Sequence, residues 1–351
     1  MKQVNVGKHI LRLAEIKDIP QIMGIIEKYM DSKHLLTRDR ACFEYDFVTD
    51  GNVNFLVAEH METGEIDAIE GFVRCSEKQV FDIFPSYWLS KPKTDTRFLG
   101  VEMGKNILGI TGARHKAGVG ITDMGAKISE LFLKLEVKIM PHYYRLAARD
   151  DFYIAEINEN KRIECEASEK WLIPIPTPEH LDRWFDFSAL PDIPMYKDRN
   201  FVVNRYFRHP YYKFNIWGIE DSPGSMTGLL VGRVVCHNNS KALRIMDFFG
   251  PDCALIGIGT EIDLYMEACG IEYTDFYCAG IEREYLERAG FTLRDENDPN
   301  IIPNHFEPYE KKNVNIYYNG CSYNGKDVRA FKGDGDQGRP RLLRLPEQWR
   351  V

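Results

Sequence analysis

Two stretches about half a chain apart repeat one pattern of apolar and polar residues. Residues 117–147 and residues 271–295 each contain a short apolar run, a turn of small residues, an amphipathic segment and a further apolar run. The period and length of these parts are typical of a strand–helix–strand unit. Aligning Leu135 with Ala289 sets the copies 154 positions apart in a chain of 351 residues. The repeat predicts a duplicated domain.

The length of the chain agrees with a duplication. Two domains of about 150 residues each are the ordinary expectation for a chain of this size. The hydrophobic content of 44% is enough to pack two cores. We predict a first domain over 1–150, a connection over 151–177, a second domain over 178–319, and an extended tail over 320–351 that packs on the cleft between the domains.

The composition argues against several classes of protein. No apolar run approaches the roughly 18 residues of a membrane span, and the first residues lack the apolar region of a signal peptide. We therefore expect a cytoplasmic protein. The formal net charge of −8 argues against nucleic acid as a partner, because binding a polyanion needs a basic surface. The eight cysteines are scattered with no CxxC pair, so we expect neither a disulfide framework nor a metal site.

Hydrophobic periodicity gives a similar order of elements in both halves. In the first half, a strand and helix at 10–30 precede a hairpin, a strand, a polar loop into a glycine-containing helix, and the first copy of the repeat. Asp18 is the expected N-cap of the first helix. The second half has a helix at 178–188, then a hairpin, a strand, a glycine-containing helix and the second copy. After about residue 296 we expect extended loops, because the tail is rich in Asn, Asp, Gly, Pro and Arg.

This order of elements resembles the GNAT acyltransferase fold. In the first half the resemblance rests on ILRLAEIKDIPQIMGII for the opening strand and helix, FLVAEHMETGEIDAIEGFV for the hairpin, and ISELFLKLEVKI for the last helix and strand. In the second half it rests on FNIWGIEDSPGSMTGLLVGRVV and YLERAGFTLR. The resemblance implies an α/β (α+β) fold of two tandem GNAT-like domains, each a mixed central sheet flanked by helices. More loosely, the whole chain, with its closing FKGDGDQGRP, resembles acyltransferase-like proteins of bacterial surface-polysaccharide gene clusters.

The resemblance also implies a loop for the pyrophosphate of the donor, acetyl-CoA or another acyl-CoA. Such a loop points unpaired N–H groups of a helix N-terminus at phosphate oxygens, and glycine lets the backbone approach. In the first domain Arg97, Phe98, Leu99 and Gly100 match the first half of the pattern, but Glu102 stands where a small residue is expected. The alternative is a solvated arginine followed by a packing glycine.

The second domain has Gly250 at the corresponding place, and its helix contains Gly257 and Gly259. These glycines either let the pantetheine arm of the donor approach or pack the helix against a strand. The resemblance also implies a tyrosine in the last helix of each domain that protonates the leaving thiolate. Phe132 and Leu286 stand at those positions, so another group must act there or one domain has lost its chemistry.

Acyl transfer to an amine needs a base for the nucleophile and dipoles for the developing oxyanion. Two residues of the tail are spaced so that on an extended segment they share one face, as a base and its orienting partner do. A histidine in the aromatic segment and an aspartate in an apolar strand are the other candidates. The catalytic candidates are His305, Glu307, His209 and Asp247.

Asp247 and Asp275 stand in strands that are otherwise apolar. A carboxylate in such a strand needs a partner or has a raised pKa, and a raised pKa suits a general base near neutrality. The alternative is an ion pair with a buried arginine such as Arg233 or Arg244.

Substrate-binding candidates lie in the aromatic segment 204–212 and in the tail. Alternating arginine and tyrosine suits a sugar or nucleotide, because rings stack on apolar faces and guanidinium groups bind phosphates. The glycine-rich run at 331–340 can wrap a ligand. Inter-domain core and an exposed acidic turn are the structural alternatives. The candidates are Asn204, Arg205, Tyr206, Arg208 and Tyr211, with Lys332, Asp334, Asp336, Gln337 and Arg339 in the tail.

Three functions remain open at this point. The first is an N-acyltransferase of surface-glycan biosynthesis, which moves an acyl group from acyl-CoA to a nucleotide-linked amino sugar. A homodimer is compatible with this function. The sugar is implied by the resemblance. The second is a tandem GNAT-fold transferase that uses aminoacyl-tRNA, against which the acidic charge counts. The third is a non-catalytic carbohydrate-binding protein, which predicts that both central clefts are plugged by side chains.

Overall fold

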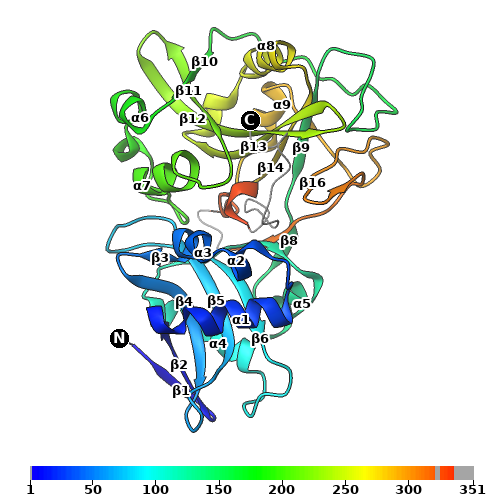
Figure 1. Ribbon diagram of the computed structural model, residues 1–351. Coiled ribbons are helices and arrows are strands. Elements are labelled where there is room, and N and C mark those ends of the chain that lie inside the picture. Colours follow the sequence, from blue (N-terminus) through cyan, green and yellow to red (C-terminus); the bar gives the residue numbers. More distant parts are fainter. Residues whose placement is uncertain (1, 321–324, 336–351) are drawn as a thin grey trace.

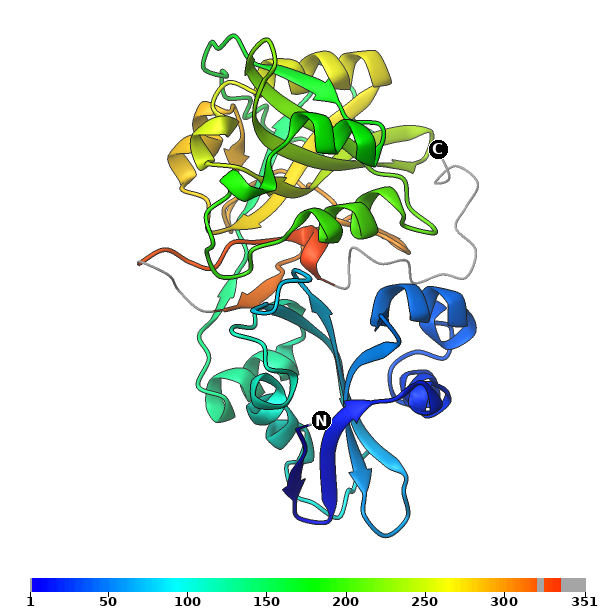
Figure 2. The same ribbon diagram turned by 90° about the vertical axis from the view of Figure 1, so that its left-hand side faces the viewer.

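The chain folds into two mixed α/β domains that lie one above the other (Figure 1). The structure is a computed structural model that describes residues 2–320 and 325–335. Each domain has a central sheet with helices on both faces, as the sequence predicted. The described closing segments of the chain, 305–320 and 325–335, run between the two domains (Figure 2).

The first domain is built on an antiparallel sheet of order β1-β2-β4-β5-β6, with the short β3 paired to β4. Strict alternation in β4 sends Phe55 and Val57 to one face and Leu56 and Ala58 to the other. Helices α1, α2 and α3 cover the first face, and α4 covers the second. The strands are β1 (Val4–Val6), β2 (His9–Ala14), β3 (Val48–Thr49), β4 (Asn52–His60), β5 (Ile66–Arg74) and β6 (Ile83–Ser90). The helices are α1 (Ile19–Tyr29), α2 (Leu35–Arg38), α3 (Arg40–Phe47) and α4 (Leu99–Thr111).

Asp18 stands at the start of α1 but makes no side-chain cap bond to that helix. Its carboxylate instead accepts from the backbone N of Glu15 at 2.8 Å and pairs with Arg12 at 2.6 Å. Asp18 therefore occupies the predicted N-cap position, but an adjacent arginine and the preceding turn take its carboxylate.

The second domain has a sheet of order β10-β11-β12-β13-β14-β9-β15, in which β13 and β14 pair in parallel. Helices α8 and α9 pack on one face, and α6 and α7 on the other. The strands are β9 (His142–Leu146), β10 (Trp171–Pro174), β11 (Asn215–Ser222), β12 (Ser225–His237), β13 (Ser240–Phe249), β14 (Ile271–Ala279) and β15 (Thr292–Leu293). The helices are α6 (Pro178–Trp184), α7 (Arg199–Val202), α8 (Gly259–Cys269) and α9 (Arg283–Arg288).

The two domains exchange strands. The first domain continues through β7 (Gly118–Ile121), α5 (Asp123–Phe132) and β8 (Val137–Ile139), but the strand between β7 and β8 is β18 (Tyr317–Asn319) from the end of the chain. In return, β9 leaves the first domain and lies between β14 and β15 of the second sheet. The boundary between the sheets therefore does not coincide with a boundary in sequence near residue 150.

The tail after residue 296 contributes buried strands, where the composition led us to expect extended loops. A hairpin of β16 (His305–Phe306) and β17 (Tyr309–Glu310) precedes β18. β19 (Ala330–Phe331) then pairs with the end of β14, and its two side chains are almost fully buried. Tertiary pairing outweighs the local preference of a polar, glycine-rich sequence here.

Candidate functional site

A cavity of about 560 Å³ opens in the first domain where β6 and β7 diverge. The two strands meet at a parallel bridge between Ile83 and Lys116 and then belong to different sheets. The start of α4 closes one side of the cavity, and α5 closes another. Phe98 and Met124 lie at its edge, with 59% and 68% of their surfaces exposed. Apolar side chains form most of the wall, and glycine-rich β7 brings backbone close to the space.

Glu70 is a buried carboxylate on β5 that lines this cavity. Only 3% of its surface is exposed. Among the residues that the structure describes, its Oε2 atom has no hydrogen-bond partner. Burial raises the pKa of Glu70 to about 7, and the nearby positive charge of Lys116 acts in the opposite direction. A carboxylate with such a pKa can accept a proton near neutral pH.

A bulge in β6 lies opposite Glu70. Ile69 pairs with Leu89 and Gly71 pairs with Ser86, so Tyr87 and Trp88 together face one residue of β5. Tyr87 has φ of 50°, a left-handed conformation that is strained for a bulky residue. A bulge leaves backbone groups outside the ladder, and both bulged residues line the cavity. The bulge therefore supplies polar backbone in an otherwise apolar wall.

The predicted donor loop of the first domain lies beside the same cavity. Phe98, Leu99 and Gly100 line it, whereas the Arg97 side chain is exposed and is not part of the wall. The helix that follows, α4, has 13 residues. Glu102, which interrupts the expected pattern, pairs with Lys105 at 2.8 Å. The structure thus places three of the four loop residues at this cavity.

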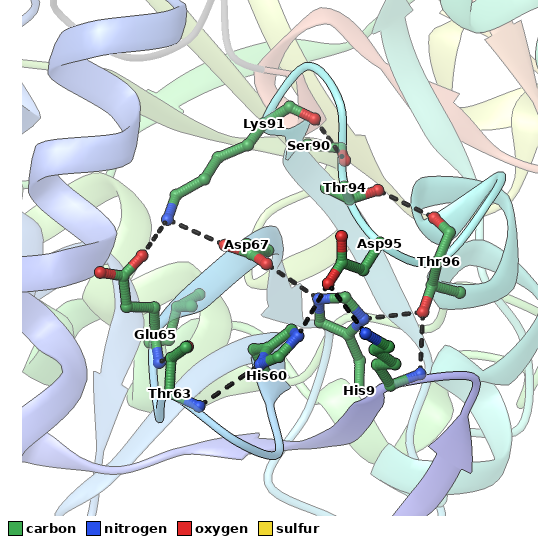
Figure 3. Close-up of polar contacts among 12 residues, drawn as sticks. His9, His60, Thr63, Glu65, Asp67, Ser90, Lys91, Thr94, Asp95 and Thr96 are labelled. Atoms are coloured by element: carbon green, nitrogen blue, oxygen red, sulfur yellow. Dashed lines mark hydrogen bonds and ion pairs between the residues drawn. The ribbon is translucent and has the colours of Figure 1, made fainter.

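A polar cluster holds the loop 91–98 that leads into α4 (Figure 3). The fully buried His9 contacts Thr96 Oγ1 through Nδ1 at 2.8 Å and Asp67 through Nε2 at 2.9 Å. His60 Nε2 lies 3.3 Å from Asp95, and the His9 and His60 rings meet edge to face at 5.1 Å. At the other end of the loop, Lys91 Nζ donates to Asp67 at 2.9 Å, so both ends are tied to strands of the first sheet.

The corresponding divergence in the second domain is filled by the tail. β13 and β14 pair as far as Ile245 and Phe276, and beyond that β19 pairs with β14. The turn at Lys332–Asp334 packs on β13, where a Cβ added to Gly333 would lie 2.6 Å from Met246 O. A cavity of about 50 Å³ remains nearby, lined in part by Gly250.

Other segments of the protein pack directly against Gly257 and Gly259. A Cβ on Gly257 would lie 2.0 Å from Ser168 Oγ, and one on Gly259 would lie 2.3 Å from Ala289 O. Ser168 belongs to the connection between the domains. The structure gives these glycines a packing role, and they line none of the cavities described above.

Asp247, a predicted base, belongs to a buried ionic cluster. Its carboxylate accepts from Lys197 Nζ at 2.7 Å, from the Tyr206 hydroxyl at 2.6 Å and from Phe248 N at 2.9 Å. Lys197 also pairs with Asp334 at 2.6 Å, and burial raises the pKa of Asp334 to about 7. The cluster fastens the tail to the second sheet, and Asp247 has its acceptor capacity engaged. Its partner is a lysine, where the arginines were the expected alternative.

Asp275 forms an ion pair with a buried arginine, which was the expected alternative to a raised pKa. Arg244 Nε donates to its Oδ1 at 2.9 Å, and Nη2 pairs with Oδ2 at 2.5 Å. Burial pushes the pKa of Asp275 upward, but the charge of Arg244 outweighs this and holds the pKa far below its usual range.

His305 and Glu307 stand at the start of the β16–β17 hairpin and at the turn that follows β16. His305 pairs with Glu310 across the β16–β17 hairpin, and Glu307 accepts from the Tyr212 hydroxyl at 2.5 Å. His209 also has a structural environment, since its Nδ1 accepts from the backbone N of Tyr211 at 3.1 Å and of Tyr212 at 3.0 Å. These residues lie in the second domain and its tail, and none of them lines the large cavity.

The segment 204–212 bridges the domains. The Tyr211 hydroxyl donates to Asp39, and the Tyr45 hydroxyl donates to the backbone O of Asn204. Asn204 and Arg205 line an inter-domain cavity of about 100 Å³, together with residues of α3 and β5. Arg205 also donates to Gly333 O at 3.0 Å.

Other predicted substrate residues are dispersed. Tyr206 is buried against Asp247, and Arg208 is bonded to Asn204 on the surface. Lys332 and Asp334 are buried in the tail turn. The predicted residues Asp336, Gln337 and Arg339 lie outside the described residues.

The two positions of the missing tyrosine differ. Phe132 is 43% exposed and its ring packs against Phe98 at 5.4 Å, near the mouth of the large cavity. Leu286 is fully buried in the core of the second domain. Ser129, one turn before Phe132, is buried and lines the cavity.

Sequence reasoning missed Glu70. The signal was present, because a carboxylate interrupts the apolar strand IDAIEGFV in the same way as Asp247 and Asp275 interrupt theirs. In the described part of the chain no group of three or more His, Cys, Asp or Glu could hold a metal ion. Over the same residues, no helix combines the length and apolar character needed to cross a bilayer.

No model of a known protein family matches the chain, and no curated protein sequence does so either. Solved structures do match. The chain is similar over 91% of its length to a conserved protein of unknown function from Enterococcus faecalis V583, called a probable N-acyltransferase, with TM-score 0.50, 6% identity and 72% of that chain covered. This likeness shows that the chain shares the fold of that protein over most of its length.

Two further structures are similar at lower scores. One is a GCN5-related N-acetyltransferase from Anabaena variabilis, with TM-score 0.49, 10% identity, and coverage of 88% of this chain and 71% of that one. The other is N-myristoyltransferase from Saccharomyces cerevisiae with bound myristoyl-CoA, with TM-score 0.46, 10% identity, and coverage of 94% and 84%.

Proposed function

We propose that this chain is an acyltransferase that moves an acyl group from acyl-CoA to an amine, and that the donor binds in the first domain. The observation that carries the proposal is the cavity between β6 and β7, which contains a buried carboxylate with a pKa of about 7. The corresponding divergence in the second domain is filled by β19 and the turn after it.

The residues at the cavity fit the chemistry of an acyl-CoA donor. The apolar wall suits an acyl chain and a pantetheine arm, and β7 offers backbone groups at glycines 118 and 120. The N-terminus of α4, with Phe98, Leu99 and Gly100, faces the same space and presents N–H groups to phosphate oxygens. When bound, acyl-CoA supplies the acyl group and the thiolate leaving group.

Glu70 accepts the proton of the attacking amine in this proposal. Its buried position and pKa near neutrality match the requirement of a general base. The bulge at Tyr87 and Trp88 supplies backbone N–H groups for the oxyanion of the tetrahedral intermediate. Ser129 stands where it can protonate the leaving thiolate in place of the missing tyrosine.

We propose that the acceptor is a nucleotide-linked amino sugar and that the reaction belongs to surface-glycan biosynthesis in the cytoplasm. This finer part comes from the sequence resemblance. The non-catalytic alternative predicts two plugged clefts, and the first domain contradicts that prediction with a cavity of about 560 Å³. An acidic chain with an apolar cavity also favours a small-molecule donor over charged tRNA.

Donor binding is tested by calorimetric titration with acetyl-CoA. Ser129→Trp places an indole in the cavity and should weaken binding at least tenfold. Leu264→Trp, at an exposed position on α8, should bind like wild type. No heat of binding and no thermal shift with acetyl-CoA at millimolar concentration, for the wild-type protein, would contradict the proposal.

Catalysis is tested by release of free thiol from acetyl-CoA in the presence of amine acceptors. Glu70→Gln keeps the shape of the side chain and should lower kcat by about 10²–10⁴ with little change in donor affinity. Unchanged kcat in this variant would remove Glu70 from the mechanism.

A further inference from the structure

A second cluster of buried polar groups lies on the face of the second sheet that points toward the tail. Arg233 and Arg244 are cross-strand neighbours on β12 and β13, so their side chains share one face. The loop before β16 brings Asn304 over this face, and the tail turn brings Lys332. Each of these four side chains has at most 8% of its surface exposed.

In part of this cluster the polar groups have hydrogen-bond partners. Arg244 pairs with Asp275 through two nitrogens and donates its third to the backbone O of Asn304. Lys332 Nζ donates to that same backbone O at 3.1 Å. Asp275 thus neutralises Arg244, and the carbonyl of Asn304 ties the two cations together.

The rest of the cluster has unused donors. Over residues 2–320 and 325–335, Arg233 Nε and Nη1 and both side-chain polar atoms of Asn304 are buried without a partner in good hydrogen-bond geometry. The hydroxyl groups of Tyr212 and Tyr277 interact with Arg233 and Asn304, respectively. The guanidinium of Arg233 stacks on Tyr212, with 3.7 Å between its carbon and the ring centroid. Stacking leaves the edge of the guanidinium, where the N–H groups point, available.

Charged groups from several elements face this cluster. Asp275, which is paired with Arg244, also acts on Lys332 and favours its protonated form. Glu307 enters the cluster through the Tyr212 hydroxyl, and His142 is neutral because burial lowers its pKa to about 4. Burial, helped by Arg244 and Arg233, also holds the pKa of Lys332 well below its usual value. Buried cations of this kind are costly unless an anion accompanies them.

We propose that Arg233, Asn304 and Lys332 form a binding site for an anionic group, a phosphate or a carboxylate. Arg233 offers two N–H groups to one anion in the geometry that guanidinium uses for phosphate and carboxylate. The Asn304 amide and the Lys332 amine, which belong to the same buried cluster, would contribute further donors.

The site stands close to the donor cavity. A Cβ on Gly335, three residues after Lys332, would lie 2.9 Å from Val119 O, and Val119 lines that cavity. Three peptide units span at most about 11 Å. We therefore assign the site to the anionic group of the acyl acceptor, an assignment that rests on the proposed function. The reactive amine would then reach toward Glu70 while its phosphate or carboxylate stays on the second domain.

Binding of the anion itself is tested without any reaction. The full chain is titrated by calorimetry with sodium phosphate and, separately, with sodium acetate at constant ionic strength. We expect saturable binding of at least one anion. Arg233→Met keeps the apolar stem on Tyr212 and should weaken that binding at least tenfold, and Lys332→Met should do the same. Arg183→Met, which removes an exposed cation from α6 of the same domain, should bind like wild type.

The outcomes separate the sources of the anion and the two proposals. Phosphate binding alone points to a phosphorylated or nucleotide-linked acceptor, and acetate binding alone points to a carboxylate acceptor such as an amino acid. Wild-type protein that binds neither anion, or a folded Arg233→Met protein that binds as tightly as wild type, overturns the site. Because the wild-type titration needs no variant, the test stands even if a substitution prevents folding. Anion binding without acetyl-CoA binding would keep this site and reject the proposed acyl transfer.

Discussion

At the scale of single residues, three carboxylates in apolar strands have three different environments. Asp275 is held ionised by Arg244, and Asp247 shares Lys197 with Asp334. Glu70 is also buried, but it faces a cavity and its Oε2 is without a hydrogen-bond partner in the described structure. The same sequence pattern, a carboxylate among aliphatic and aromatic neighbours, thus marks two structural ion pairs and one candidate base. Which role a carboxylate has depends on the side chain that lies next to it in the folded protein.

The raised pKa of Glu70 makes stability depend on pH. The folded-state pKa of about 7 lies above the usual glutamate pKa of 4.5. The contribution of this group to stability is therefore fully present below about pH 4.5 and is lost as the pH rises through 7. The loss amounts to roughly 3 kcal/mol in the free energy of unfolding.

Glu70→Gln removes that titration. Urea unfolding at pH 5, 6.5 and 8 should show the variant gaining stability relative to wild type as the pH rises. Glu62→Gln, at an exposed position, is the matched control and should track wild type. A constant difference between Glu70→Gln and wild type across these pH values would contradict the buried, unpaired state of this carboxylate.

At the scale of elements, the loop between β6 and α4 is positioned by contacts with strands far away in sequence. Thr96 Oγ1 contacts His9 Nδ1 at 2.8 Å, accepts from Lys8 N at 3.1 Å and donates to Val6 O at 3.2 Å (Figure 3). The loop leads directly into the residues at the cavity mouth. Its conformation therefore depends on the β1–β2 hairpin.

Thr96→Val keeps the shape of the side chain but removes these bonds. It leaves a buried ring nitrogen of His9 without its partner, which costs about 1–3 kcal/mol. Chemical denaturation should show this loss, and calorimetry should show weaker acetyl-CoA binding because the loop is released. Thr63→Val, in an exposed turn of the same cluster, is the control. Wild-type donor affinity in a destabilised Thr96→Val protein would separate the cluster from donor binding.

At the scale of the whole molecule, the exchange of β9 and β18 makes the two domains depend on each other. β9 pairs with β14 and β15 of the second sheet, while β18 fills the space between β7 and β8 of the first. Separation of the domains would expose the edges of two strands, which is unfavourable in water. The segment 204–212 adds contacts from Tyr211 to Asp39.

Because the domains exchange strands, we predict that the two fragments stay associated after the connection is cleaved. A protease site introduced at the exposed residues 166–169 should yield two fragments that co-elute in size-exclusion chromatography and separate in denaturant. The fragments hold each other's strands, so dissociation requires both sheets to lose a central strand. Separation in native buffer would show that the exchanged strands contribute little.

The two copies also differ in architecture. In the first domain the divergence of the central strands remains an open cavity with α4 at its side. In the second domain the tail occupies the equivalent divergence, and a cationic cluster lies on the adjacent face. This asymmetry agrees with a donor-side domain and an acceptor-side domain.

Much of the fold could be predicted from the chain alone, because period and turn chemistry are local. The duplicated order of elements, the mixed sheets flanked by helices and the helix starting near Gly100 all follow from the spacing of apolar residues. The partners of Arg244 and Asp275 were also foreseeable, since buried charges need opposite charges. For the same reason, Glu70 could have been suspected.

Other features were decided by tertiary structure. The strand exchange cannot be read from β9 or β18, because a strand's sequence specifies its two faces but not which edge it joins. The tail has the composition of a loop, yet β19 is buried because it completes an open edge of β14. Whether a diverging pair of strands stays open or is filled depends on segments more than fifty positions away. The sequence by itself therefore determined a duplicated GNAT-like frame, and the long-range contacts of the tail determined which copy holds the cavity.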